Sequence, residues 1–379
     1  MNPRETGPAV VVIGAGIIGA AVAWELARRG AQVEIFEART PGQGATQASA
    51  GMLAPYTEAR ATAVFEALCI EGLSAYDDFV EALRAETSHP FEYRRSGTVE
   101  VALDQAGVAH LTREATRLAD IPEARARWIP GERLRDEEPA LAERALGALV
   151  VEAHGLVAAP ALTQALMDAG RRRGVRVHAV TPVRRIQRVG SRYEVTGGEL
   201  RVVADAVVVC AGAWAGRLRL EGHASPSVHP IRGQLLYIRP RTPLFSRILW
   251  GPRCYLVPWQ DGTVLVGATV EDVGFDETTT VRGVHDLMAA AIDLVPELAS
   301  AALVGVRAGL RPATADELPL LGPVPGEPRL ILATGHYRNG VLLAPLTARI
   351  VADLLLEERA HRALETLGPA RGRKHTSAL

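Results

Sequence analysis

Lysine is almost absent from this chain of 379 residues, although arginine is abundant. The single lysine is Lys374, close to the C-terminus. A Walker-type phosphate loop needs a lysine beside the bound phosphates, and a pyridoxal phosphate enzyme needs one for its Schiff base. The body of the chain therefore supports neither kind of site.

Cysteine is also scarce, and the three thiols (Cys69, Cys210 and Cys254) share no short metal-ligand spacing. An odd number of widely separated cysteines makes a poor disulfide framework. We therefore expect reduced thiols, no metal site and a cytoplasmic location.

The chain lacks an excess of charge of either sign, with a formal net charge of −1, and it lacks long apolar runs. Nucleic-acid binding usually requires a basic surface, and a membrane span requires roughly 18 consecutive apolar residues. Residues 1–8 are polar and contain no readable signal peptide. These absences exclude a nucleic-acid partner and a membrane span from the predicted function.

What the sequence does contain, at its beginning, is the pattern of a βαβ unit. Residues 9–13 form a short continuous apolar run, typical of a strand buried on both faces. A glycine-rich turn follows, then small and apolar residues at helical spacing over 17–29, with Gly30 as the expected C-cap. Residues 31–36 alternate like a second strand.

Strand and helix patterns of the parallel type recur in three separated blocks, with antiparallel patterns between them. This order predicts an α/β protein, in which a second domain of α+β type is inserted into a discontinuous Rossmann-like domain. The expected cofactor domain comprises residues 1–90, 146–230 and 303–379. The expected substrate domain, built on an antiparallel sheet, comprises 91–145 and 231–302. Within it, residues 108–145 are highly charged and are expected to be helical.

The first chemical motif is Gly14-Ala-Gly-Ile-Ile-Gly19, which lies between the first predicted strand and the first predicted helix. Gly14 would allow a tight turn, Gly16 a close approach of a pyrophosphate, and Gly19 close packing of helix on strand. The helix N-terminus offers N–H donors and a partial positive charge to phosphates. Glu37 follows at the end of the second strand, where a carboxylate accepts hydrogen bonds from ribose hydroxyls. The sequence therefore predicts a dinucleotide site.

Three further segments favour FAD over NAD. Residues 44–55 are a run of small residues against which a flat isoalloxazine ring could lie, although such a run is equally compatible with a tight surface loop. Residues 206–214 form a buried strand that runs into small residues, and 335–340 form a strand-to-helix turn. A helix that begins near Gly340 could stabilise negative charge on a flavin through its dipole.

These motifs, in this order, resemble the D-amino-acid oxidase superfamily of FAD oxidoreductases, and within it the glycine oxidases of bacterial thiamin synthesis. The similarity covers nearly the whole chain. Its most specific parts are Ser49-Ala-Gly-Met-Leu53, Cys254-Tyr-Leu-Val-Pro258 with Val266-Gly-Ala-Thr269, Gly309-Leu-Arg-Pro312, and Gly335-His-Tyr-Arg-Asn-Gly-Val-Leu-Leu-Ala-Pro345.

The resemblance implies particular roles for several of these residues. Arg311 would pair with the carboxylate of the substrate, Tyr255 would line the same pocket, and Arg338 would lie beside flavin and substrate. The substrate side chain would be bordered by Gly51, Met52 and Val270. The positions that the resemblance places against FAD are Gly14, Gly16, Ile17, Ile18, Gly19, Glu37, Ala38, Ala45, Thr46, Ala50, Gly51, Met52, Val183, Gly212, His336, Tyr337, Arg338, Asn339, Gly340, Val341 and Leu342.

Two departures separate the chain from the related sarcosine oxidases, which attach FAD to a cysteine in the C-terminal half and use a lysine with oxygen. No cysteine follows Cys254 here, and no lysine precedes Lys374. The resemblance therefore implies non-covalent FAD, and it also suggests a homotetramer.

The reaction that these residues support is hydride transfer from the Cα of an amino acid to flavin, with molecular oxygen as the final acceptor. The sequence leaves open whether glycine, sarcosine or a small D-amino acid is preferred. It also leaves open a D-amino-acid dehydrogenase that passes electrons to a quinone, and a flavin-bearing subunit of tRNA modification or of an assembly.

Overall fold

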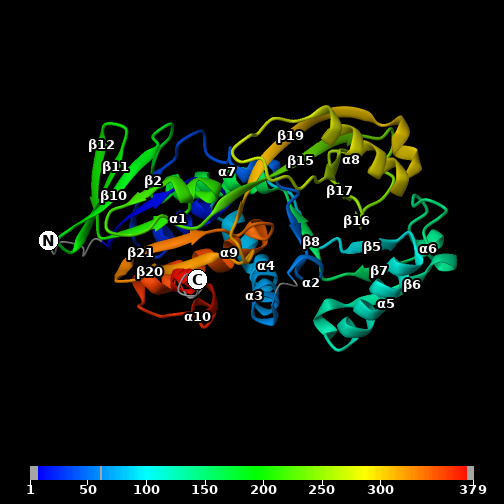
Figure 1. Ribbon diagram of the computed structural model, residues 1–379, viewed down its shortest axis with the longest axis horizontal. Helices are drawn as coiled ribbons and strands as arrows, with labels where there is room; N and C mark the ends of the chain where they lie inside the picture. Colours follow the sequence, from blue (N-terminus) through cyan, green and yellow to red (C-terminus); the bar gives the residue numbers. More distant parts are fainter. Residues whose placement is uncertain (1–6, 60–61, 374–379) are drawn as a thin grey trace, which may run out of the picture.

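The computed structural model describes residues 7–59 and 62–373. Lys374 and residues 1–6 lie outside this part of the chain. The sequence arguments on the single lysine and on the signal peptide concern these residues. Figure 1 shows an elongated molecule, with the parallel sheet and its helices at one end and a second sheet at the other. Among the helices of the described residues, none has the length and apolarity needed to cross a membrane.

The first domain is built on a six-stranded sheet in the order β20-β21-β13-β1-β2-β9. Its strands are parallel except for the antiparallel pair at the β20 edge. Their bounds are β1 Ala9–Ile13, β2 Gln32–Phe36, β9 Arg176–His178, β13 Ala206–Val209, β20 Leu320–Val324 and β21 Glu327–Thr334. The predicted βαβ unit is therefore confirmed: β1 and β2 pair in parallel, and α1 (Ile17–Arg28) connects them.

Both faces of this sheet are covered, which explains the continuous apolar run of β1. Val10 and Val12 pack into a core with helices, whereas Val11 and Ile13 pack into a core on the opposite face. The helical side is formed by α1, α3 (Ala63–Ser74), α4 (Tyr76–Arg84), α7 (Ala159–Arg172) and α9 (Gly340–Leu356). The other face is covered by a four-stranded sheet of β10 Val183–Val189, β11 Arg192–Gly197, β12 Leu200–Ala204 and β14 Arg219–Leu220.

The second domain is built on an eight-stranded sheet in the order β19-β15-β18-β17-β16-β5-β7-β6. Every neighbouring pair is antiparallel except β16 with β5. The strands are β5 Thr98–Ala102, β6 Ala126–Pro130, β7 Gly147–Val151, β15 His229–Arg239, β16 Ile248–Trp250, β17 Tyr255–Pro258, β18 Val264–Gly267 and β19 Ala302–Ala313. The mixed α/β fold, with one parallel and one antiparallel sheet, is as the sequence predicts.

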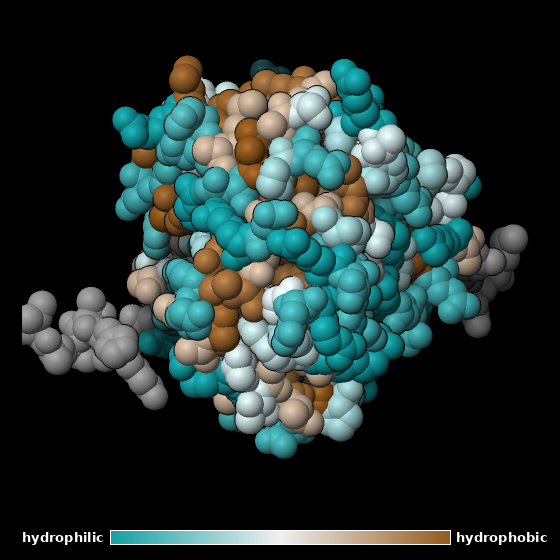
Figure 2. Space-filling model, turned by 90° about the vertical axis from the view of Figure 1, so that its right-hand side faces the viewer, coloured by the Kyte–Doolittle hydropathy of each residue, from teal (hydrophilic) through white to brown (hydrophobic). Residues whose placement is uncertain are grey.

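Helices α5 (Gln105–Ala119), α6 (Gly131–Glu137) and α8 (Val281–Leu294) pack against this second sheet. Figure 2 looks onto the end of the molecule that carries them, and there the hydrophobic side chains lie in separated groups among hydrophilic ones. The remaining short elements are β3 Met52–Leu53, β4 Tyr93–Arg94, β8 Gly155–Val157, α2 Pro55–Glu58, α10 Leu364–Leu367, and the 3-10 helices η1 Ala45–Ala48, η2 Pro122–Ala124, η3 Gly212–Arg217, η4 Pro296–Ser300 and η5 Pro369–Arg373.

The prediction that residues 108–145 are helical is wrong, because they are not helical throughout. Helices α5 and α6 are separated by β6, the edge strand of the eight-stranded sheet. Only Ile129 of β6 is buried. The strand therefore lacks the period of two between buried and exposed side chains by which a sequence predicts a strand.

Two strands of the second sheet lie in residue ranges that were expected to belong to the cofactor domain. Strand β7 falls within the range 146–230, and all of β19 except Ala302 falls within 303–379. Yet β7 pairs with β5 and β6, and β19 pairs with β15. The identity of a strand's partner depends on contacts far along the chain, and local patterns do not encode it. We propose a division that keeps the three-part cofactor domain but assigns β7 and β19 to the substrate domain.

Candidate active site

A large cavity opens where the two sheets meet. Its volume is about 340 Å³, which lies within the roughly 300–1,000 Å³ of common ligand pockets. Most of the residues predicted for the site lie on its wall. These are Gly14, Gly16, Ile17, Ile18, Glu37, Ala38, Ala45, Thr46, Ala50, Gly51, Met52, Val183, Gly212, Tyr255, Arg311, His336, Tyr337, Arg338, Gly340 and Val341.

The turn between β1 and α1 requires glycine at two positions. Gly14 has a φ of +102°, and a Cβ on it would lie 2.5 Å from the carbonyl oxygen of Cys210. A Cβ on Gly19 would lie only 1.9 Å from the carbonyl oxygen of Gly14. Strand β1, helix α1 and the end of β13 therefore approach one another more closely than any side chain would allow.

The N-terminus of α1 faces the cavity. Gly16 is its N-cap and provides no side chain, so the first-turn N–H groups lack the usual capping acceptor. The hydroxyl of Thr46 accepts a hydrogen bond from the Ile17 N–H at 3.0 Å, and Thr46 itself lies on the cavity wall. Exposed donors and a helix dipole at this point suit a phosphate group.

Glu37 is held beside the same turn. Its Oε2 accepts a hydrogen bond from the Ala15 N–H at 2.7 Å, and its Oε1 accepts one from the Arg39 N–H at 2.8 Å. Each carboxylate oxygen can accept more than one hydrogen bond. Glu37 therefore has a fixed position and retains capacity for the hydroxyls of a ribose.

The turn before α9 forms another part of the wall. His336 is buried, burial lowers its pKa to about 4, and its Nε2 lies 3.1 Å from the Thr347 hydroxyl. The imidazole is therefore neutral near pH 7 and positions the turn. The amide oxygen Oδ1 of Asn339 is buried and finds no hydrogen-bond partner among the described residues.

Tyr255 and Arg311 come from two strands of the second sheet, and both line the cavity. Burial raises the pKa of Tyr255 to about 12, although the positive charge of the nearby Arg311 opposes this shift. The phenol is thus a neutral donor over the physiological range. A Cβ on Gly267 would lie 2.4 Å from the ring of Tyr255, and a Cβ on Gly233 would lie 2.4 Å from the guanidinium of Arg311. Both side chains therefore lie flat against bare backbone.

The Arg311 guanidinium is anchored through one of its nitrogens. Its Nη1 donates to the carbonyl oxygen of Thr269 at 3.0 Å and to that of Arg232 at 3.3 Å. A guanidinium carries further donors on its other nitrogens. Arg311 can therefore be held by the backbone and still present donors to a carboxylate in the cavity.

Sequence reasoning missed an acidic residue in this group. Glu58, the last residue of α2, is half-buried and lines the cavity. Burial raises the pKa of its carboxyl to about 7, against the lowering effect of Arg338 and Arg311. Among the described residues, no hydrogen bond or ion pair engages this carboxylate. Its position soon after the small-residue run was a weak signal, because acidic residues are common throughout the chain.

Four predicted residues do not line the cavity. Gly19 and Leu342 are buried in the core, Asn339 is buried behind the turn, and Val270 is 53% exposed. Val270, which was expected to border the substrate, thus lies outside the cavity wall in this structure. Its neighbours Thr269 and Glu271 both bind β15, so the side chain between them faces the other way. Lining residues that the sequence did not single out for the site include Phe36, Arg39, Ser49, Glu58, Trp214, Arg217 and Thr334.

Comparison with known proteins agrees with this geometry. The family model described as FAD dependent oxidoreductase (DAO) matches residues 9–354. The chain is 36% identical to glycine oxidase of Geobacillus kaustophilus over 360 residues, which is 94% of each protein. It is 34% identical to the bifunctional protein ThiO/ThiG of Synechocystis over 97% of this chain, although it spans 54% of that longer protein.

The solved structures agree in fold. The crystal structure of glycine oxidase from Geobacillus kaustophilus superposes with a TM-score of 0.91 at 34% identity, covering 96% of this chain and 99% of that one. Iminodiacetate oxidase from Chelativorans has a TM-score of 0.85 at 29% identity, with 95% and 98% covered. The chain therefore belongs to the DAO family of FAD-dependent oxidoreductases, and within it to the FAD-dependent amino-acid oxidases of the glycine oxidase kind.

Proposed function

We propose that this protein oxidises glycine, and also sarcosine or small D-amino acids, to the corresponding imine with formation of hydrogen peroxide. Water then converts the imine from glycine into glyoxylate and ammonia. The observation that carries the proposal is that the Arg311–Tyr255 pair opens onto the same cavity as the Gly14–Gly19 turn. A site for a small carboxylate and a site for a dinucleotide are thus adjacent.

The wall of the cavity fits FAD. The bare backbone at Gly14 and Gly16 admits a pyrophosphate, and Glu37 retains acceptors for a ribose. When bound there, FAD would accept a hydride from the substrate, and molecular oxygen would receive the electrons. Of the three cysteines, Cys210 alone lies on the wall, and burial raises the pKa of its thiol. Because a thiolate is the reactive form, we propose non-covalent FAD.

In this proposal the chain's own residues bind and orient the amino acid. Arg311 pairs with the substrate carboxylate, and the neutral Tyr255 hydroxyl donates a second hydrogen bond to it. Arg338 adds positive charge, and Gly51 with Met52 borders the substrate on the other side. Fixing the carboxylate fixes the direction of the Cα–H bond, which is an orientation effect.

Glu58 would act on the amine. An amino acid arrives with an ammonium group, and hydride loss from Cα requires the neutral amine, because the nitrogen lone pair forms the new C=N bond. Glu58 lines the same cavity as Arg311 and Arg338, and their positive charges lower the pKa of its carboxyl against the effect of burial. We propose that a substrate held by Arg311 has its nitrogen near this acceptor. We propose that Glu58 accepts the ammonium proton.

The proposal is tested by purifying the protein and supplying glycine, sarcosine and D-alanine separately. We expect a yellow protein that forms peroxide, and FAD that remains in the supernatant after acid precipitation. Rapid reduction of a dye without peroxide would instead indicate a dehydrogenase. A protein that cannot take up FAD, or one that binds FAD but oxidises none of the three, would contradict the proposal.

The role of Glu58 predicts a change in pH dependence when Glu58 is replaced by glutamine. In the parent enzyme kcat/KM should rise as pH increases through about 7, because the carboxyl becomes an acceptor above its pKa. In Glu58→Gln this rise should disappear from that range and kcat/KM should fall. Steady-state kinetics between pH 5.5 and 9 would check it, and an unchanged pH profile would rule out proton transfer to Glu58.

Gly233→Ala tests the position of Arg311 without removing its charge. The new Cβ would lie 2.4 Å from the guanidinium, the flexible end of a side chain, so Arg311 should move and the sheet should not. We expect KM for the amino acid to rise roughly tenfold or more, since a misplacement of about 1 Å in a site can cost up to 10²-fold. Thermal unfolding should change little, and an unchanged KM would contradict the assignment of Arg311.

The biological role of the reaction is also a proposal. The similarity to the bifunctional protein ThiO/ThiG supports a role for the imine product in forming the thiazole of thiamin. We also propose the homotetramer that the resemblance suggests, which size-exclusion chromatography with light scattering would measure.

A further inference from the structure

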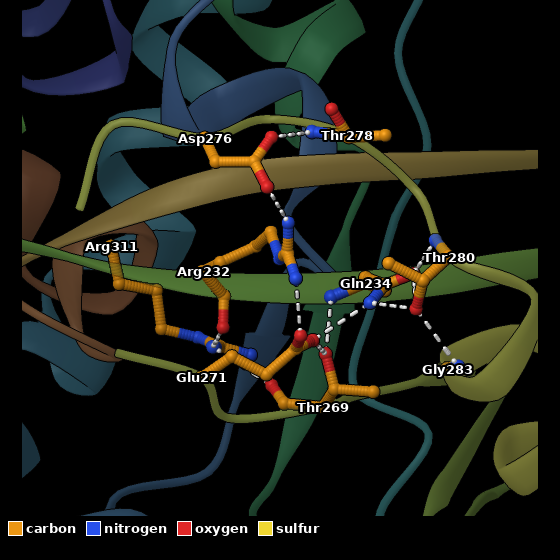
Figure 3. Close-up of polar contacts among 9 residues, drawn as sticks. All are labelled: Arg232, Gln234, Thr269, Glu271, Asp276, Thr278, Thr280, Gly283 and Arg311. Atoms are coloured by element: carbon orange, nitrogen blue, oxygen red, sulfur yellow. Dashed lines mark hydrogen bonds and ion pairs between the residues drawn. The ribbon is translucent and has the colours of Figure 1, made fainter. Parts of the chain in front are cut away.

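Residues 269–280 form a segment, here called the strap, that runs from the end of β18 to the start of α8. Its first part is bound to β15 by reciprocal backbone hydrogen bonds: the Arg232 N–H donates to the Glu271 carbonyl at 2.8 Å, and the Glu271 N–H donates to the Arg232 carbonyl at 3.0 Å. Figure 3 shows β15 and the strap side by side at this point, with the side chains of both converging.

Arg232 is the centre of this contact. Its side chain is only 4% exposed and forms ion pairs with Glu271 and with Asp276, two strap residues on either side of it (Figure 3). Glu271 also accepts hydrogen bonds from the Gln234 amide at 2.8 Å and from the Thr269 hydroxyl. One buried cation thus binds two carboxylates that are five positions apart in the strap and fixes the backbone between them.

The end of the strap is fixed by a second buried residue of β15. Gln234 is 1% exposed, and its Oε1 accepts a hydrogen bond from the Thr280 N–H at 2.7 Å. The Thr280 hydroxyl in turn accepts one from the Gly283 N–H at 3.1 Å and caps α8.

Between these two anchors the strap contacts the cavity wall. The ring of Phe275 lies 5.8 Å from that of Trp214, and the guanidinium of Arg217 lies 3.5 Å above the ring of Phe275. Glu277 forms an ion pair with Arg39 at 2.7 Å. Trp214, Arg217 and Arg39 all line the cavity.

The strap also carries a direct contact with Arg311. The guanidinium of Arg311 is held by two backbone carbonyls, that of Thr269 in the strap and that of Arg232 itself. The position of these two oxygens depends on how the strap and β15 are joined, and the Arg232 ion pairs join them. No other hydrogen bond to the backbone anchors Arg311 within the described part of the chain.

We propose that Arg232 is a positioning residue for the substrate carboxylate: through Glu271 and Asp276 it fixes the strap, and the strap fixes Arg311. The inference rests on the proposed role of Arg311. Arg232 does not line the cavity, so its loss should alter binding of the carboxylate more than the rate of the chemical step.

The experiment replaces Arg232 by methionine, which has a similar length and no charge, and compares it with Arg232→Lys. In Arg232→Met we expect KM for the amino acid to rise roughly ten- to a hundredfold, with kcat within about threefold of the parent. The dissociation constant of acetate, a carboxylate without an amine, should rise by the same factor. Acetate binding is measured on the FAD-loaded protein as the acetate-dependent increase in Tm, which requires no turnover. Arg232→Lys keeps the charge but loses the fork of donors that reaches two carboxylates. Its KM and its dissociation constant for acetate should lie between those of the parent and those of Arg232→Met.

Two controls separate positioning from stability. Glu271→Gln is the milder variant that decides the question if Arg232→Met does not fold, because it keeps the shape of the side chain. Glu137→Gln is its matched control. Glu137 ends helix α6 and also binds an arginine through both oxygens, at 2.6 and 2.8 Å, but this arginine is Arg127 on β6, the edge strand opposite β19. We expect Glu137→Gln to leave KM and acetate binding unchanged.

The variants at Arg232 and Glu271 are here called the strap variants. The proposal is overturned if they lower Tm yet bind acetate and the amino acid as the parent does. Arg311→Ala in the same assay identifies the cause of such a result. If Arg311→Ala weakens acetate binding and the strap variants do not, the positioning role alone is wrong. If Arg311→Ala also leaves acetate binding unchanged, the carboxylate site of the proposed function is wrong, and the role of Arg232 falls with it.

Discussion

Arg311→Ala should raise KM for the amino acid by about a hundredfold or more while the protein keeps its fold and its yellow colour. A charge-assisted pair between guanidinium and carboxylate in a sheltered site contributes roughly 3 kcal/mol, which corresponds to about two orders of magnitude in affinity. The other contacts proposed for the carboxylate, with the Tyr255 hydroxyl and the charge of Arg338, cannot replace a bidentate donor. Steady-state kinetics with glycine and the dissociation constant of acetate would measure the loss.

Arg307→Ala provides the matched control for this experiment. Arg307 lies on the same strand, is exposed, donates to the carbonyl oxygen of Gln47 at 3.1 Å and does not line the cavity. Its replacement should leave KM close to that of the parent. A similar KM in Arg311→Ala and in the parent would mean that another residue holds the carboxylate.

Gly19→Ala should yield a protein that binds little or no FAD. The added Cβ would lie 1.9 Å from the carbonyl oxygen of Gly14, and both partners are backbone, so helix α1 must move away from the turn. Overpacking of this kind costs about 1–3 kcal/mol, and the displaced helix N-terminus no longer faces the phosphates. Loss of a tightly bound ligand lowers Tm further by mass action. The ratio of flavin to protein absorbance and the Tm with added FAD would measure both effects.

Gly305→Ala is the corresponding control, because a Cβ on Gly305 meets nothing within 4 Å and this glycine lies on the exposed part of β19. We expect its flavin content to equal that of the parent. Gly19→Ala protein with full flavin content would show that the turn can relax without losing the cofactor, and the assignment of this turn to the pyrophosphate would then be in doubt.

The sequence by itself determined the features that depend on neighbouring residues. The βαβ unit follows from an apolar run, a helical period and a turn that needs a positive φ at Gly14, all within residues 9–36. Glu37 could be predicted for the same reason, because it ends the strand beside that turn. Arg311, Tyr255 and Arg338 were named from the resemblance, and the structure brings all three to one cavity although their roles remain proposals.

Only the tertiary structure decided which distant residues share that cavity. Glu58 stands on a four-residue helix with no distinctive pattern, and its carboxyl is unusual only because folding buries it near two arginines. Val270 lies outside the cavity wall, because the residues on either side of it bind β15. Arg232 looks like any other arginine in the sequence, yet it is buried between two carboxylates. Burial and charge pairing arise when strands far apart in the chain meet, so no local pattern of residues records them.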